Sequence, residues 1–243
     1  MKKEIFTVAL MMTAAVFAEE IKPVALYDFE KVEGSNVIAS AGVNGMICNP
    51  GKNAVLVEGR KGGKALQLAG DYKSRGNNGA MAVRGINITE DKLFTLMADL
   101  QLTGEEGFRE FKEIFSMCDG DRGPGFRCFI YYGSLVFRSG DGSKYSDIGS
   151  KAAQVRIPVK RWIRVAAVYD AEKVRLYIDG VKVAEGNAKI TAAKTNTLVF
   201  GAYRSGYAYP ANAVFDNIAV FDKALSDAAI AEDYAKLLNE DVI

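Results

Sequence analysis

Residues 165–186 read VAAVYDAEKVRLYIDGVKVAEG, and this stretch predicts a β-hairpin. Two apolar runs meet at Asp179-Gly180, a dipeptide typical of two-residue hairpin turns in which both residues have positive φ. Gly180 adopts that conformation without steric cost, and Asp179 tolerates it. Nothing else in the hairpin is reactive, so we expect it to hold a fold rather than to carry chemistry.

Strand patterns recur along the rest of the chain, with Gly, Asp and Asn between them. The clearest is LFTLMADLQL (93–102), where strict alternation puts the apolar side chains from Phe94 to Leu102 on one face. Many short strands with turns about every 8–12 residues are typical of a sandwich or barrel. One amphipathic helix is predicted over 226–240, with Ser226 as its N-cap. The other predicted strands cover residues 23–30, 63–70, 111–118, 126–132, 134–139, 161–170, 173–179, 181–186, 196–203 and 213–222.

The first 18 residues, MKKEIFTVALMMTAAVFA, match a secretory signal peptide. Lys2 and Lys3 form a charged start, an apolar run follows, and Val16 and Ala18 occupy the positions that a signal peptidase reads. The apolar run is shorter than the ~20 residues that a transmembrane helix needs. We therefore expect cleavage after Ala18, one domain over residues 19–243, and a secreted, periplasmic or cell-surface location.

The charge balance and the histidine content exclude several function classes. The chain has 31 basic and 30 acidic residues without a basic run, so we expect no nucleic-acid partner. A polybasic or amphipathic segment that would hold the chain on a membrane is also missing. The chain has no histidine, which excludes Ser-His-Asp and Cys-His nucleophilic sites and His-ligated zinc.

The order of the segments resembles that of laminin-G-like jelly-roll domains, in the concanavalin A-like lectin and glucanase superfamily. WIRVAAVYDAEKVRLYIDGVKVAEG (162–186) resembles the signature strand pair, and LYDFE (26–30) resembles the opening strand. GKALQLAG (63–70) and residues 198–235 resemble a further strand and the closing strands with their helix. The resemblance implies an all-β jelly-roll sandwich of two antiparallel sheets with a short C-terminal helix. It does not specify a ligand, because the fold hosts lectins, adhesion modules, enzymes and spacers.

Several stretches depart from patterns known in these relatives. ASAGVNG (39–45) lacks the Asp that often follows the first strand, which removes one cation ligand, and Asp99 stands where a Trp is common. The Glu-x-Asp-x-x-Glu strand of laminarinase-like glycosidases is missing, since EIFSMCD (113–119) holds carboxylates only at its ends. Alginate-lyase-like relatives need a Gln-x-His strand, which this chain cannot supply. Trp162, by its place in the family pattern, is expected in the core.

Three sets of side chains are candidates for carbohydrate binding. The first is a cluster of three tyrosines in the loop 203–210, the strongest aromatic surface signal in the chain. The side chains of the second and third sets alternate with core-facing residues on predicted strands, so they would form a groove if that face of the sheet is concave. The alternative is an ordinary sheet face in contact with solvent. In this order, the sets are Tyr203, Tyr207 and Tyr209; Asp99, Arg175 and Tyr177; and Arg127, Phe129 and Tyr131.

The sequence also predicts a metal site and a disulfide. In folds of this type the first and last strands are neighbours, so Glu30 and Asp216 are expected to approach each other and bind a structural Ca²⁺. The alternative is that Asp216 accepts a backbone hydrogen bond. Cys118 and Cys128 flank a predicted loop between adjacent strands, which favours a disulfide in an exported protein; alternatively, Cys128 is a small core residue.

Together these features favour a secreted, non-catalytic domain that binds carbohydrate or a cell-surface or extracellular component. Two alternatives remain: a glycan-active enzyme of glycosidase or lyase type that uses Asp99, and a structural module of an exported assembly. The missing histidine and the missing carboxylate trio favour the binding domain over the enzyme.

Overall fold

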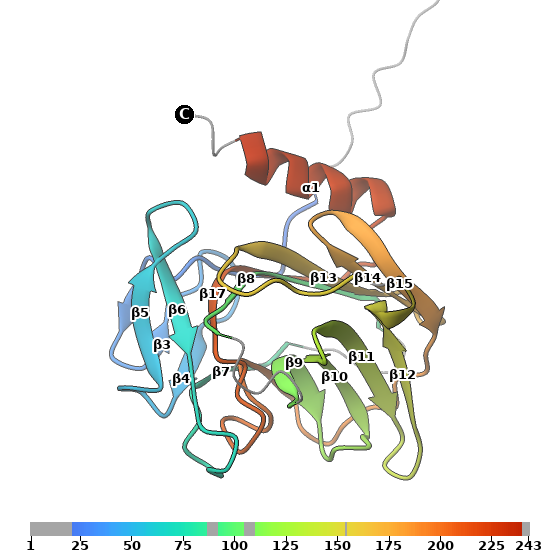
Figure 1. The fold of residues 1–243 in the computed structure, drawn as a ribbon, viewed down its shortest axis with the longest axis horizontal. Helices are drawn as coiled ribbons and strands as arrows, with labels where there is room; N and C mark the ends of the chain where they lie inside the picture. Colours follow the sequence, from blue (N-terminus) through green and yellow to red (C-terminus); the bar gives the residue numbers. More distant parts are fainter. Residues whose placement is uncertain (1–20, 87–91, 105–109, 154, 240–243) are drawn as a thin grey trace, which may run out of the picture.

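The alternating strands form two antiparallel sheets that pack face to face, with one helix outside them (Figure 1). The computed structural model describes residues 21–86, 92–104, 110–153 and 155–239. The predicted signal peptide lies outside these residues. The predicted two-sheet sandwich with a C-terminal helix is confirmed.

The eight-stranded sheet has the order β15-β14-β13-β8-β17-β6-β5, and β1 pairs with β17 at one end of that strand. This sheet therefore joins the first strand of the chain to the last, as predicted. Its strands are β1 (Ala25–Tyr27), β5 (Ala54–Glu58), β6 (Lys64–Leu68), β8 (Phe94–Leu102), β13 (Ile163–Tyr169), β14 (Lys173–Ile178), β15 (Val181–Asn187) and β17 (Ala213–Phe221).

The nine-stranded sheet has the order β12-β11-β10-β9-β16-β7-β4-β3-β2. A short 3₁₀ helix, η1 (Ser150–Ala153), follows its edge strand β12. Its strands are β2 (Val32–Glu33), β3 (Asn36–Val37), β4 (Gly45–Cys48), β7 (Ala80–Arg84), β9 (Lys112–Cys118), β10 (Gly125–Tyr131), β11 (Ser134–Gly140), β12 (Tyr145–Gly149) and β16 (Thr197–Phe200).

The hydrophobic core fills the space between the two sheets. The predicted alternation along β8 is confirmed, because the core-facing residues from Phe94 to Leu102 are all at most 4% exposed. Phe94 contacts Phe126 and Tyr169, with ring centroids 5.0 and 5.5 Å away. Trp162 precedes β13 and is half-buried rather than in the core, contrary to expectation.

The hairpin between β14 and β15 has the predicted turn. Asp179 and Gly180 have φ values of 51° and 76°, and Ile178 pairs with Val181 across the turn. The Asp179 carboxylate also accepts a hydrogen bond from the backbone N–H of Arg164 at 2.9 Å, which ties the turn to β13. The hairpin therefore holds the fold, as the sequence indicates.

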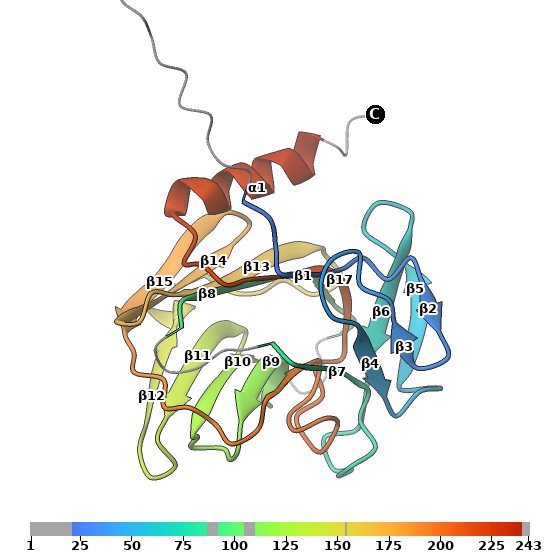
Figure 2. The same ribbon diagram turned by 180° about the vertical axis from the view of Figure 1, so that it is seen from behind.

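The helix α1 (Asp227–Asn239) covers the outer face of the eight-stranded sheet (Figures 1 and 2). Its predicted cap is confirmed, since the Ser226 hydroxyl accepts a hydrogen bond from the backbone N–H of Ala229 at 3.1 Å. Ile230 packs from the helix into a second apolar cluster that includes Met97 and Tyr177 on the outside of the sheet. The helix therefore covers the outer face of the eight-stranded sheet and, among the described residues, leaves the outer face of the other sheet without such a cover.

The predicted disulfide between Cys118 and Cys128 is wrong, and both thiols are free. The strand register pairs Cys118 with Gly125, three residues before Cys128, so the two side chains leave the sheet on opposite faces. Cys128 faces the core between the sheets, which confirms the alternative interpretation of that residue.

Candidate functional site

The outer face of the nine-stranded sheet lies on the opposite side of the sandwich from α1 (Figures 1 and 2). Arg127, Phe129 and Tyr131 point outward here, because they alternate along β10 with residues of the core cluster. The third predicted set therefore shares one face, next to strands β9 and β11. The other two predicted sets must be located relative to it.

Five aromatic side chains form a continuous row across this face, which we call the aromatic row. Its members are Tyr72, Tyr209, Phe111, Tyr131 and Tyr132, and successive ring centroids lie 5.6, 5.3, 4.4 and 4.5 Å apart. Tyr132 is 45% exposed and the other four are half-buried. Partly exposed rings of this kind offer apolar surface with polar hydroxyl ends.

A network of ion pairs lies beside the aromatic row and holds the sheet and its loops together. Arg127 donates to both carboxylate oxygens of Glu113, at 3.0 and 2.7 Å, and also pairs with Asp121. Arg138 forms a two-pronged pair with Asp147, at 2.7 and 2.8 Å. Burial raises the pKa of the Glu113 carboxyl, and the facing guanidinium of Arg127 opposes that rise.

The Arg127 side chain connects this network to the aromatic row. Its guanidinium carbon lies 4.7–5.7 Å from the ring centroids of Tyr203, Tyr209, Phe129 and Phe111. A cation over an aromatic face is attractive, and more so when water is excluded. Arg127 is only 1% exposed, so it fixes these rings from below rather than meeting a ligand itself.

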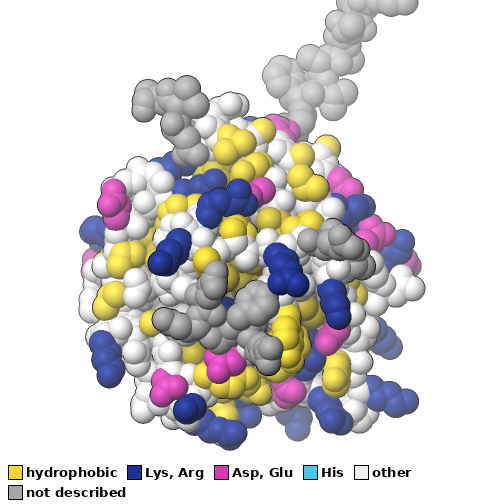
Figure 3. Space-filling view, viewed as in Figure 1, with side chains coloured by type: hydrophobic (Ala, Val, Ile, Leu, Met, Phe, Trp, Pro, Cys, Tyr) yellow, Lys and Arg dark blue, Asp and Glu magenta, His cyan; other side chains and the backbone are white. Residues whose placement is uncertain are grey.

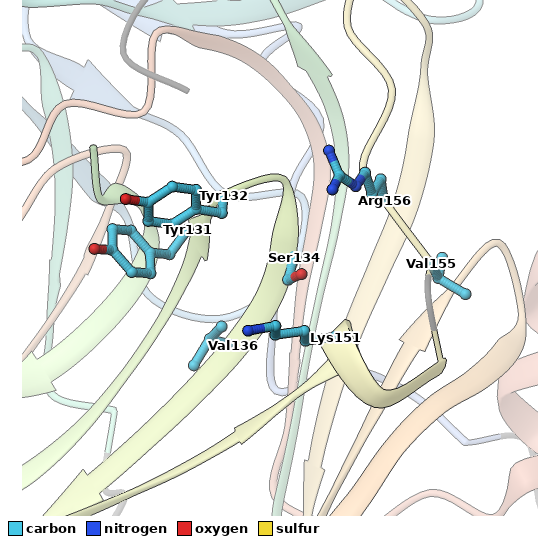
Figure 4. Close-up of a pocket in the computed structure, with 7 residues that line it drawn as sticks. All are labelled: Tyr131, Tyr132, Ser134, Val136, Lys151, Val155 and Arg156. Atoms are coloured by element: carbon cyan, nitrogen blue, oxygen red, sulfur yellow. The ribbon is translucent and has the colours of Figure 1, made fainter. Parts of the chain in front are cut away.

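A pocket of about 880 Å³ opens at the exposed end of the aromatic row (Figure 4). The rings of Tyr131 and Tyr132 lie side by side on one part of its wall, and Lys151 extends from η1 toward Val136 of β11. Arg156 lines the same pocket. A neighbouring pocket of about 560 Å³ shares three of these residues and continues over Phe129 and Asp147; the shared residues are Tyr131, Val136 and Lys151.

The three tyrosines of the loop 203–210 do not form one platform. Tyr203 is 5% exposed and Tyr209 is half-buried, and both rings face Arg127. Burial raises the pKa of Tyr203 to about 12. Tyr207 is 40% exposed, and its hydroxyl accepts a hydrogen bond from Arg75 at 2.9 Å. Only Tyr209 of this predicted set belongs to the aromatic row.

Asp99 lies on the other outer face, where it is fully buried. It accepts hydrogen bonds from Arg60 at 3.1 Å, from Arg164 at 3.0 Å and from the side-chain amide of Asn217 at 2.9 Å. Arg164 also pairs with Asp233 of α1. Asp99 therefore links the sheet to the helix and has no surface for a substrate.

Arg175 and Tyr177 also face α1 rather than a groove. Both donate to the Asp227 carboxylate in the first turn of the helix, at 2.6 and 2.7 Å. The predicted groove of Asp99, Arg175 and Tyr177 is therefore wrong, because α1 lies on that face of the sheet. The sequence indicated the correct strand faces but not which of them the helix covers.

Glu30 and Asp216 both hold the loop between β5 and β6. Glu30 accepts a hydrogen bond from the backbone N–H of Lys64 at 2.7 Å, and Asp216 accepts one from Arg60 at 3.0 Å. Burial raises the pKa of Asp216 to about 6, with smaller upward contributions from Asp99 and Glu30. Within the described residues, no group of three or more His, Cys, Asp and Glu side chains could hold a metal. The calcium site stays a prediction.

Residues 75–231, more than half of the chain, match the family model of the concanavalin A-like lectin/glucanases superfamily. The chain belongs to this family. No curated protein matches the chain significantly. None of the helices in the described part of the chain is long and apolar enough to cross a bilayer.

Solved structures with the same fold include two toxin binding domains. The binding domain of Paraclostridial Mosquitocidal Protein 1 is 16% identical, with a TM-score of 0.66 over 90% of this chain and 53% of that one. The binding domain of botulinum neurotoxin serotype G is 12% identical, with a TM-score of 0.65 over 89% and 51%. The chain thus spans about half the length of these toxin domains, and the similarity shows that they share its fold.

A third solved structure matches over almost its whole length. Domain 4 of AbnA, a GH43 extracellular arabinanase from Geobacillus stearothermophilus, was solved in complex with arabinotriose. It is 18% identical to this chain, with a TM-score of 0.63 over 88% of this chain and 98% of that domain. The sandwich by itself is therefore comparable in extent to that domain.

Proposed function

We propose that the chain is a non-catalytic carbohydrate-binding domain whose binding face is the outer face of the nine-stranded sheet. The observation that carries this proposal is the partly exposed aromatic row, which ends in a pocket between two tyrosines and two cationic side chains. Aromatic faces contact the apolar faces of sugar rings, and hydroxyl and cationic groups hydrogen-bond to their oxygens.

The comparison with AbnA supports the proposal at the level of the fold. A domain of the same fold and similar extent was solved with an oligosaccharide bound. Because a shared fold does not fix a function, the aromatic row and the pocket of this chain carry the proposal.

The alternative of a glycan-active enzyme required Asp99 as its key carboxylate. Asp99 is fully buried and paired with Arg60 and Arg164, so its carboxylate cannot reach a substrate in this arrangement. The structural-module alternative predicts that no glycan binds at all. A binding experiment therefore separates it from the proposal.

We also propose that the domain works outside the cytoplasm, on a glycan of a cell surface or the extracellular medium. The N-terminal pattern of Lys2, Lys3, an apolar run and Ala18 supports export. Mass spectrometry of the exported protein should find Glu19 as its first residue. An exported protein that retains Met1 would contradict the predicted cleavage.

A glycan array probed with the purified protein tests the function itself. A hit should then be titrated against Tyr131→Ala and Tyr132→Ala, and we expect each to weaken binding about tenfold or more. Tyr207→Ala separates the aromatic row from the exposed tip of the tyrosine loop, and we expect unchanged affinity. Thermal unfolding of each variant shows whether a loss of binding reflects a loss of folding. If only Tyr207→Ala weakened binding, the site would lie on the loop instead.

A further inference from the structure

The pocket at the end of the aromatic row is positively charged by its own side chains. Lys151 and Arg156 line it together with Tyr131, Tyr132 and Ser134, and none of the described lining residues is acidic. The chain as a whole has a net charge of only +1, and Figure 3 shows basic and acidic side chains interspersed over one face of the molecule. The positive charge is therefore a local property of the pocket.

Two acidic residues on this sheet face are already held by other cations. Asp147 borders the neighbouring pocket, and both of its oxygens accept hydrogen bonds from Arg138, at 2.7 and 2.8 Å. Asp121 pairs with Arg127 and Arg138. Within the described ranges Lys151 forms no ion pair, so its charge is left for a ligand.

The backbone on both sides of the pocket is pinned to the β10–β11 hairpin. The fully buried Ser150 hydroxyl accepts a hydrogen bond from the N–H of Leu135 at 3.0 Å and donates one to the carbonyl of Val155 at 3.1 Å. The N–H of Ile157 donates to the carbonyl of Gly133 at 2.8 Å. Lys151 directly follows Ser150, and Arg156 directly precedes Ile157. Hydrogen bonds therefore hold the backbone next to each of the two cations, and both cations line the same pocket as the two tyrosine rings.

We propose that this pocket selects acidic glycans, with the sugar ring against Tyr131 and Tyr132 and its carboxylate or sulfate group at Lys151 and Arg156. This inference rests on the proposed carbohydrate-binding function and names its ligand class. Hydrogen bonds between a cation and an anion are about twice as strong as neutral ones, and both cations suit carboxylate and sulfate oxygens. A neutral glycan would lack this attraction between opposite charges.

Calorimetric titration of the full chain with three probes tests the inference. The probes are tetragalacturonate, its fully methyl-esterified form, and a heparin-derived tetrasaccharide. The ester keeps the sugar backbone and removes the charge, so it isolates the contribution of the carboxylates. We expect one or both acidic probes to bind at least about tenfold more tightly than the ester, and this preference should shrink at high salt.

Two variants with the same change of charge locate the effect. Lys151→Gln should weaken binding of the acidic probe much more than binding of the ester, and so remove most of the preference for the acidic probe. Lys52→Gln removes an exposed lysine in the turn between β4 and β5, and should change neither affinity because β4 lies five strands away from β11 in the sheet order.

The outcomes distinguish the inference from the proposed function. Preference for the heparin tetrasaccharide over tetragalacturonate supports sulfate as the recognised group, and the reverse supports carboxylate. Equal binding of tetragalacturonate and its ester without heparin binding, or an acidic preference that survives Lys151→Gln, overturns the inference while the carbohydrate-binding function stands. If none of the three probes binds, the inference is overturned, and a neutral hit on the glycan array would still support the function.

Discussion

At the scale of single residues, Gly180 combines a backbone requirement with a tertiary contact. Its φ is +76°, and a Cβ at this position would lie 3.0 Å from the Cβ of Tyr234 in α1. Gly180→Val should therefore lower the free energy of unfolding by about 1–3 kcal/mol in urea melts. The smaller change Gly180→Ala has Gly34→Ala as its matched control, because Gly34 has a φ of +61° with nothing within 4 Å of the added Cβ. Equal losses for Gly180→Ala and Gly34→Ala would show that the contact with Tyr234 does not matter.

Asp216 gives a prediction about pH at the same scale. Burial raises its pKa to about 6, above the value near 3.9 of an unfolded aspartate, so the folded protein binds this proton more tightly. The contribution of Asp216 to stability is therefore present at low pH and is lost as the pH rises from about 4 to about 6. Urea melts should show that the difference between the wild type and Asp216→Asn changes across this window and is constant above pH 7.

Asp141 is a control of opposite sign for that experiment. Hydrogen bonds from the N–H groups of Lys144 and Ser143 lower the pKa of its exposed carboxyl to about 2. Its contribution is present above pH 4 and is lost as the pH falls toward 2. If the Asp216→Asn difference followed the same acidic window as Asp141→Asn, the raised pKa of Asp216 would be refuted.

At the scale of elements, the junction of β1, β17 and the β5–β6 loop carries the proposed calcium site. Glu30 and Asp216 lie close enough for their charges to interact, and a hard cation with oxygen ligands would relieve that repulsion. An ion that binds only the folded state raises the unfolding midpoint in proportion to the logarithm of its concentration. We therefore expect the thermal midpoint to rise with calcium and to fall with excess chelator. An unmoved midpoint, with Glu30→Gln equally insensitive to calcium, would mean that the two carboxylates serve only the loop backbone.

The element boundaries show what alternation can and cannot predict. All eleven predicted strands and the helix are present, and seven of these strands are seven to nine residues long, which is enough for an apolar period of two to stand out. The missed strands are two to five residues long or polar, as in the exposed edge strand YSDIG, and are β2, β3, β4, β5, β7 and β12. Their strand conformation depends on pairing with neighbours rather than on their own pattern.

At the scale of the whole molecule, the position of the candidate site depends on how the helix and the loops pack against the two sheets. The residue pattern of a single strand does not show this packing. Parity correctly placed Arg127, Phe129 and Tyr131 on one outer face. It could not show that α1 would cover the opposite sheet and bury Asp99. Nor could it bring Phe111 and Tyr132 into one row, although two adjacent tyrosines before the β10–β11 turn were a signal of an exposed aromatic end.

This division of the two outer faces predicts that stability and binding can be lost separately. Asp99→Ala leaves Arg60 and Arg164 buried without their shared carboxylate, and should lower the free energy of unfolding by about 3–5 kcal/mol without changing glycan affinity. Tyr132→Ala truncates a 45% exposed ring, and should change stability by less than about 0.5 kcal/mol while weakening binding. Urea melts and glycan titrations on both variants check the pair.

The reversed result would place the function on the other sheet. If Asp99→Ala, still folded at the assay temperature, lost affinity while Tyr132→Ala kept it, the ligand would have to reach the face beneath α1. Asp99→Asn provides the same comparison if the alanine variant does not fold, because the amide retains the size of the carboxylate and removes its charge. The helix would then have to move away for binding, since Asp227 and Asp233 hold it to that sheet through Arg175 and Arg164.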